Sequence, residues 1–230
     1  MIEDPMTAES GPDDRASVPQ GRPYLAMVKL VEDLFATHGD SHRGLGYSNE
    51  NGFHDRYRAY LDVTRFGPPV QAPVRVLDIG CATGRLLDHI KASTRTDIVY
   101  RGVDLSATIL DKARDKHPEA DFIHGDPFDL DHIWAEQPDY VVMGGLFTSR
   151  LSMSEEQMTD YMLRMLRLAF SRCRVGIAFD VNSKHVDWER DDLFHVGFDR
   201  MAGMVRQHLG RNYVFRSDYG RYEYTTYVYR

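Results

Sequence analysis

The chain has 230 residues, of which 42% are hydrophobic, 11% are aromatic and 27% are charged. This composition is typical of one folded globular domain and excludes a chain that is disordered throughout or collagen-like. The formal net charge of -7 at pH 7 argues against a nucleic-acid-binding protein, because phosphate contacts need a clustered basic surface.

The N-terminal segment is rich in proline, glycine and small or acidic side chains. Such a segment cannot bury enough apolar surface to order itself, so we expect a disordered tail over residues 1–22 and a folded domain over residues 23–230. The same segment is acidic where a secretory signal is basic and then apolar, and no apolar run approaches the roughly 20 residues of a membrane span. We therefore expect a cytoplasmic protein that does not bind membranes.

Two helices are predicted ahead of the first strand. The first is amphipathic and ends at Gly39, because apolar side chains recur at helical spacing: Tyr24, Met27, Val28, Val31, Leu34 and Phe35. A second helical pattern covers residues 53–64 and ends ahead of the Gly67-Pro68-Pro69 sequence.

Beyond residue 73, short apolar runs alternate with helical stretches, a pattern typical of buried parallel strands. The runs cover residues 74–79, 97–103, 120–123, 140–143 and 174–179. Two of the intervening helices carry start signals: Ser106 as an N-cap, and Ser154 with Gln157 as a capping box. Two further runs, 213–217 and 222–230, close the chain, and the alternation in the second suits an antiparallel edge strand.

This order predicts an α/β fold with a doubly wound, mostly parallel seven-stranded sheet, an antiparallel last strand and two N-terminal helices. In such sheets ligands bind beyond the carboxyl ends of the strands, where the strand order reverses. We therefore expect the functional residues to follow the strands directly.

The most informative stretch is the loop Asp78-Ile79-Gly80-Cys81-Ala82-Thr83-Gly84, which follows the first strand. Gly80 and Gly84 permit a tight turn, so a ligand can lie against the amide groups at the start of the next helix. In a dinucleotide-binding fingerprint, the start of this helix binds a pyrophosphate. A carboxylate directly before the turn would repel that anion. Asp78 stands there, and it favours a ligand with a cationic amino group.

This loop resembles the first motif of the class I S-adenosylmethionine-dependent methyltransferases, DxGxGxG, with Ala82 in place of the middle glycine. The resemblance covers almost all of the chain after the N-terminal tail and implies a Rossmann-like fold with S-adenosyl-L-methionine as the cofactor. It further implies that Asp78 lies near the cofactor's ammonium group, and that the loop holds its methionine portion through Gly80, Cys81, Ala82 and Gly84.

The following strands carry further matches to the same family. By resemblance, Asp104 after the second strand accepts the ribose hydroxyls, with Leu105 beside it. Asp126 after the third strand accepts from the adenine amino group, while Pro127 or Phe128 flanks the ring. The stretch with Gly144 after the fourth strand lines the methyl-transfer cleft. Each acid alone is also explained by an ordinary turn or cap, but three in order after successive strands are hard to explain in this way.

The stretch before the first strand is similar to the entry helix of family members that act on small molecules. In that comparison Tyr47 forms a Gly-aromatic turn, and the guanidinium of Arg58 is a candidate to bind the cofactor's carboxylate. A packing tyrosine and a surface arginine explain the two residues equally well.

Methyl transfer from a sulfonium is an in-line displacement, so a dedicated base is optional. If the acceptor must lose a proton, the candidates by strand order are His54, Asp180, His185 and Asp187, and His185 is preferred because its loop is expected to overhang the methyl group. No Asp followed downstream by Asp-Asn, the metal-ligand pattern of catechol methyltransferases, is present. Neither Cys81 nor Cys173 has zinc-site spacing, so we expect a metal-independent enzyme.

The sequence therefore predicts methyl transfer to an oxygen or nitrogen of a small-molecule metabolite. Two alternatives remain at this stage: a catalytically silent S-adenosylmethionine-binding protein that acts through a partner, and a nicotinamide-dependent oxidoreductase, against which Asp78 and the missing GxGxxG argue. The tyrosines between residues 213 and 229 either pack on the edge strands or form a homodimer surface, and packing on the edge strands is favoured. The sequence does not identify the acceptor, because the loops that form acceptor pockets have no local sequence signature.

Overall fold

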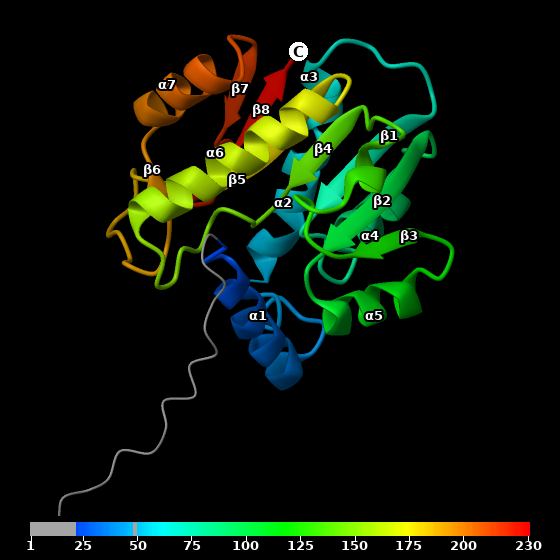
Figure 1. The fold of residues 1–230 in the computed structure, drawn as a ribbon, viewed down its shortest axis with the longest axis horizontal. Helices are drawn as coiled ribbons and strands as arrows, with labels where there is room; N and C mark the ends of the chain where they lie inside the picture. The colour runs from blue at the N-terminus through cyan, green and yellow to red at the C-terminus, as the bar shows by residue number, and fades with distance from the viewer. Residues whose placement is uncertain (1–21, 48–49) are drawn as a thin grey trace, which may run out of the picture.

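The structure, a computed structural model, describes residues 22–47 and 50–230, so residues 1–21 of the predicted tail lie outside the described residues. One sheet forms the centre of the fold (Figure 1). Its strands are β1 (Val74–Ile79), β2 (Ile98–Asp104), β3 (Asp121–His124), β4 (Tyr140–Met143), β5 (Gly176–Ser183), β6 (His195–Val196), β7 (Tyr213–Arg216) and β8 (Glu223–Tyr229). Its helices are α1 (Leu25–His38), α2 (Asn51–Leu61), α3 (Val63–Phe66), α4 (Arg85–Ala92), α5 (Ala107–Lys116), the 3-10 helix η1 (Asp131–Trp134), α6 (Glu155–Arg172) and α7 (Phe198–His208).

The strand order is β3-β2-β1-β4-β5-β8-β7. Strand β1 pairs in parallel with both β2 and β4, so the order reverses between β1 and β4. Among the described strands, β8 alone is antiparallel to the rest of the sheet, because it pairs in antiparallel fashion with both β5 and β7. The prediction of a doubly wound, mostly parallel sheet with an antiparallel last strand is confirmed, and it places the ligand-binding edge beyond the carboxyl ends of β1 and β4.

The predicted number of strands and of N-terminal helices differs from the structure. An eighth strand, β6, pairs in parallel with the end of β5 and is too short to leave an apolar pattern. The second predicted helix is split into α2 and α3 at Asp62, which is the C-cap of α2 and donates its amide to the carbonyls of Arg58 and Tyr60. The carboxylate of Asp62 forms ion pairs with Arg65 and Arg216, each at 3.2 Å.

Both faces of the sheet are covered, which explains the continuous apolar runs of its central strands. Along β4, Val141 and Met143 pack into one core with α6, α7 and η1. Tyr140 and Val142 pack into the opposite core with α2, α3, α4 and α5. Among the described residues, none of the helices combines the length and the apolar character that crossing a bilayer requires.

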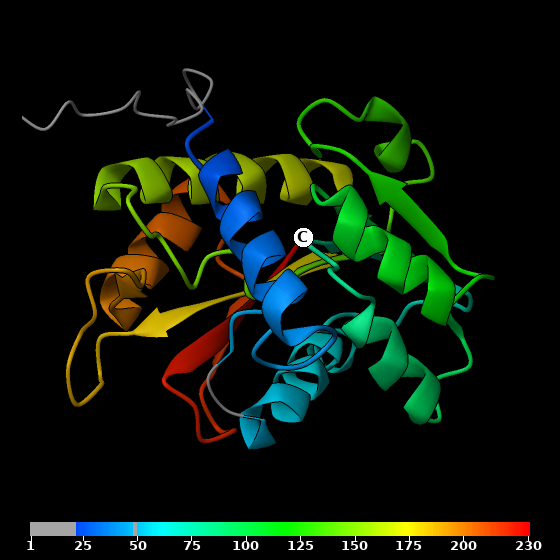
Figure 2. The ribbon, with the colours of Figure 1, turned by 90° about the horizontal axis from the view of Figure 1, so that it is seen from below.

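Helix α1 belongs to neither layer but crosses the lower end of the sheet in Figure 1, and Figure 2 shows it in front of the strand ends. Its apolar stripe was predicted from the spacing of Met27, Val28 and Val31. These side chains face a cavity at the carboxyl ends of the strands. The helix therefore closes the edge at which this fold binds ligands.

Candidate active site

A cavity lies at the carboxyl ends of β1, β2 and β4, beneath α1 and α2. All three acids that the sequence singled out, Asp78, Asp104 and Asp126, line it. They reach it because parallel strands end at one edge of the sheet, as the register of β1 with β2 and of β2 with β3 shows. Of the other predicted residues, seven also line the cavity: Tyr47, Gly80, Cys81, Ala82, Leu105, Pro127 and Gly144.

The loop after β1 is a tight turn with left-handed backbone at three positions. Gly80 and Gly84 have φ values of 75°, and Ala82 has a φ of 47°. The amide groups of Gly80 and Cys81 both donate to the carbonyl of Val103 on β2. Gly84 is the N-cap of α4 and is not among the residues that line the cavity. The unfavourable φ of Ala82 is offset by a hydrogen bond of 2.9 Å from its amide to the Asp104 carboxylate.

Asp78 is buried at the end of β1, and its Oδ2 atom accepts a hydrogen bond of 2.8 Å from the hydroxyl of Tyr100. Burial raises the pKa of Asp78 to about 7, and the nearby charge of Asp104 acts in the same direction. A cationic group in the cavity would favour the ionised form of this carboxylate.

Asp104, at the end of β2, is held by backbone amide groups. Its Oδ2 atom accepts from the amide of Ala82 and its Oδ1 atom accepts from the amide of Ser106, each at 2.9 Å. Burial raises the pKa of Asp104, against the effect of these hydrogen bonds. The carboxylate is therefore fixed in one orientation while it lines the cavity, a geometry suited to accepting hydroxyl groups of a ligand.

Asp126 follows β3 and is already engaged by the segment before α1. The hydroxyl of Tyr24 donates to its Oδ2 atom at 2.7 Å, and the guanidinium of Arg22 lies 2.8 Å from the same atom. Pro127 lines the cavity. Phe128 does not, because it packs against the rings of Tyr24 and Tyr161 instead.

The structure does not bring Arg58 to the cavity. Its side chain is 60% exposed and forms an ion pair of 3.4 Å with Asp55. The buried arginine of α2 is Arg56, two positions earlier, whose guanidinium lies 4.2 Å from the centre of the Tyr47 ring and pairs with Glu223. Two residues correspond to about 200° around a helix, so Arg56 and Arg58 lie on opposite faces of α2.

His185 also lies away from the cavity. It is exposed in the loop after β5, and its ring stacks on Phe198 with centroids 5.6 Å apart. The acid of β5 that lies near the cavity wall is Asp180, which accepts from the hydroxyl of Tyr60 at 2.6 Å and from the amide of Gly145 at 2.7 Å. Burial raises the pKa of Asp180 to about 6. Asp180 therefore holds two wall residues in place from behind.

Sequence reasoning missed the aromatic wall of the cavity. Besides Tyr47, its rings are Tyr24, Tyr57, Tyr60 and Tyr161. The apolar stripe of α1 did signal a buried face, but a stripe that faces a ligand has the same spacing as one that faces a core. The structure places Tyr57 and Tyr60 of α2, Tyr24 just before α1 and Tyr161 of α6 around one cavity at the strand ends.

Gly144 provides a test of this wall. A Cβ atom at this position would overlap the ring of Tyr60, so Gly144→Ala is expected to displace the ring and to lower the free energy of unfolding by about 1–3 kcal/mol. Urea denaturation measures the change. The matched control is Gly203→Ala in α7, where a Cβ meets nothing within 4 Å and stability should stay equal or rise by up to about 1 kcal/mol. Wild-type stability of Gly144→Ala would contradict the packing described here.

Comparison with known proteins gives consistent results. A family model described as a methyltransferase domain matches residues 76–169. The methyltransferase Rv1506c, so named in Mycobacterium tuberculosis, is 27% identical over 162 residues, which are 68% of this chain and 93% of that protein. Magnesium protoporphyrin IX methyltransferase from Synechocystis, solved with bound S-adenosylhomocysteine, has a TM-score of 0.59 at 16% identity and covers 88% of this chain and 99% of its own.

A second solved structure, the plantazolicin methyltransferase in complex with a desmethyl-plantazolicin analogue and S-adenosylhomocysteine, also has a TM-score of 0.59, at 10% identity. It covers 92% of this chain and 94% of its own. At such identities these structures show a shared fold. With the matched domain and the three strand-end acids, the chain is a class I S-adenosylmethionine-dependent methyltransferase, and S-adenosylmethionine is its cofactor.

Proposed function

We propose that this methyltransferase transfers the methyl group to an oxygen or nitrogen atom of a small-molecule metabolite by metal-independent in-line displacement. The observation that carries the proposal is the cavity itself, which is lined by five tyrosines, apolar side chains and three acids. No Arg or Lys is among the described residues that line it. Among the same described residues, no group of three His, Cys, Asp or Glu side chains is placed to hold a metal ion.

The chemistry of this lining fits S-adenosylmethionine. When bound, the cofactor supplies a methyl group on a positively charged sulfur. We propose that Asp78 holds the ammonium group and that Asp104 accepts the ribose hydroxyls, since Asp78 is buried, Asp104 is partly buried and both line the cavity. The faces of the tyrosine rings suit a cation, and the closed wall of α1 and α2 excludes water from the reacting atoms.

Asp126 is proposed to lie near the adenine ring, with Pro127 against its face. Its Oδ1 atom accepts from the amide of Phe128 at 3.0 Å, while its Oδ2 atom is engaged by Tyr24 and Arg22. A carboxylate oxygen can accept more than one hydrogen bond, so an adenine amino group can share it. Leu105 and the backbone of residues 80–82 complete the proposed contacts.

The lining also supports a choice among acceptors. An acceptor with a carboxylate or phosphate would add a second anion to the carboxylate of the cofactor, and no Arg or Lys among the described lining residues could replace its water shell. A neutral or cationic acceptor avoids this cost. Two of the similar solved structures are methyltransferases named for magnesium protoporphyrin IX and for plantazolicin, which supports a small-molecule acceptor here. A cytoplasmic location and a homodimer stay predictions.

The test is methyl transfer from S-adenosylmethionine that carries a labelled methyl group. The acceptor panel contains phenols and alcohols, amines, carboxylic acids, phosphonates and RNA, each with wild-type enzyme and with Asp104→Ala as the matched blank. We expect labelled product from hydroxyl or amino acceptors without a negative charge, and none from the variant. Label found only on RNA or on an anionic acceptor would contradict the proposal.

A further inference from the structure

The segment that contains α1 is attached to each of the three loops that follow β3, β2 and β1. At its start, Arg22 and Tyr24 reach Asp126 after β3. In its middle, the hydroxyl of Ser106, after β2, donates to Glu32 at 2.6 Å. At its end, Asp40 is bonded to the loop after β1. The wall of the cavity is therefore fastened to the same loops that carry the three acids.

The attachment at Asp40 joins the most partners. Its Oδ1 atom accepts from the hydroxyl of Thr83 at 2.6 Å and from the guanidinium of Arg85 at 2.7 Å, and its Oδ2 atom lies 3.3 Å from the ammonium of Lys116. The backbone carbonyl of Asp40 accepts a further bond of 2.6 Å from Arg85. Asp40 lies directly after the turn that ends α1, and Thr83 lies within the glycine-rich loop.

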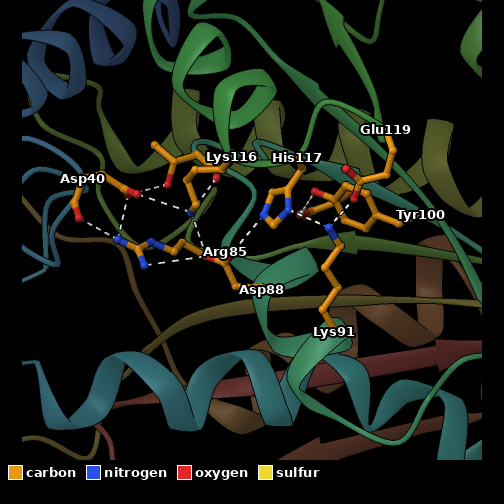
Figure 3. A network of polar contacts seen from close by, with 10 residues as sticks. Asp40, Arg85, Asp88, Lys91, Tyr100, Lys116, His117 and Glu119 are labelled. Atoms are coloured by element: carbon orange, nitrogen blue, oxygen red, sulfur yellow. Dashed lines mark hydrogen bonds and ion pairs between the residues drawn. The ribbon is translucent and has the colours of Figure 1, made fainter.

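These partners are themselves held in place, as Figure 3 shows. The ammonium of Lys116 also donates to the carbonyl of Thr83 at 3.0 Å and to Asp88 at 2.7 Å, and Asp88 accepts from the ring of His117 at 2.7 Å. The two basic donors, Arg85 and Lys116, are therefore also anchored to Asp88, at 3.6 Å and 2.7 Å, and the Asp40 carboxylate joins them to the end of α1.

Electrostatics show that Asp40 is held as an anion. Its side chain is only 15% exposed. Burial acts to raise the pKa of Asp40, but the hydrogen bond from Thr83 and the charges of Lys116 and Arg85 outweigh it, so that the pKa lies below its usual value. Charge-assisted bonds of this kind are stronger than neutral ones, so Asp40 attaches this end of the α1 segment strongly.

The loop to which Asp40 is bonded contains an unfavourable backbone conformation. Thr83 is fully buried and follows Ala82, whose left-handed φ of 47° is unfavourable for a residue with a Cβ atom. A bond from Asp40 to the hydroxyl of Thr83 fixes this part of the turn. The same bond sets the end of α1 above the loop, and thereby the position of the apolar wall.

We propose that Asp40 is a positioning residue for the cofactor: it couples the α1 wall to the loop of residues 80–84 and so sets how tightly the cofactor is held, without touching it. Asp40 is not among the residues that line the cavity. The inference rests on the proposed placement of S-adenosylmethionine in the cavity.

The test measures the binding of S-adenosylhomocysteine by titration calorimetry to the full chain. Asp40→Ala is expected to raise the Kd about 10- to 100-fold, because it removes charge-assisted hydrogen bonds. Asp40→Glu keeps the carboxylate and is expected to regain part of the lost affinity. The matched control is Asp33→Asn, an exposed acid of α1, whose Kd should stay within about twofold of wild type.

A second pair of variants distinguishes coupling from a general loss of structure. Thr83→Val removes the hydroxyl donor but keeps the buried volume, and Asp40→Asn keeps the shape of the side chain. If both act through one bond, the Kd of the double variant should rise less than the product of the two single effects. Wild-type affinity in folded Asp40→Asn and Thr83→Val, with or without a lower Tm, would overturn the proposal. Absence of binding by the wild-type protein would instead refute the proposed function.

Discussion

Replacing Asp104 with alanine is expected to weaken the binding of S-adenosylhomocysteine by at least about 100-fold, because two charge-assisted hydrogen bonds to a ligand are lost together. The carboxylate lines the cavity and also receives the amide of Ala82. Its removal therefore takes away the proposed ribose acceptor and the partner that steadies the loop after β1. Titration calorimetry measures the change directly.

Two variants make this result specific. Asp104→Asn keeps the size of the side chain and one acceptor oxygen, so it should retain more affinity than Asp104→Ala. Asp111→Ala removes an exposed acid of the neighbouring α5, which pairs only at the surface with Arg114 at 3.0 Å, and should leave the Kd unchanged. Equal affinity of Asp104→Ala and wild type would place the ribose elsewhere.

The second large effect is a dependence of cofactor binding on pH. Burial raises the pKa of Asp78 to about 7, so the carboxylate is mostly protonated below that pH. A cationic cofactor binds the ionised form, and its affinity is expected to rise by up to about tenfold per pH unit until pH 7, and to level off above it. Binding near pH 6.5 should release protons, which calorimetry in buffers of different ionisation enthalpy detects.

The stability of the free protein depends on pH in the opposite direction to cofactor affinity. The folded pKa of about 7 lies above the ordinary aspartate pKa of 3.8, so between these values the folded state holds the proton more tightly than the unfolded state. The contribution of Asp78 to the free energy of unfolding therefore falls as the pH rises, by up to about 1.4 kcal/mol per unit. Asp78→Asn should remove this slope and the proton release. Persistence of both in the variant would assign them to another group.

Much of the site was predictable because its signals are local. A buried strand followed at once by an acid and a tight turn can be read from the sequence, and parallel pairing then brings Asp78 and Asp104 to one edge, as found in the register of β1 with β2. The capping box of Ser154 and Gln157 at the start of α6 is confirmed for the same reason.

The remaining features depend on how distant segments pack. The helical pattern of α2 does not reveal which arginine faces inward, since Glu223, the partner that buries Arg56, comes from β8. The ring of His185 stacks on Phe198, the first residue of α7, and lies away from the cavity. The attachment of Asp40 to Thr83 joins residues 43 positions apart. Such contacts leave no periodic pattern in the chain.

The most direct measurement is a crystal structure of the protein with S-adenosylhomocysteine. The account predicts the nucleoside beneath α1, with its ribose hydroxyls on the Asp104 carboxylate and its amino group beside Asp78. A ligand bound away from the ends of β1 and β2, or a cavity that remains empty at saturating ligand, would contradict it.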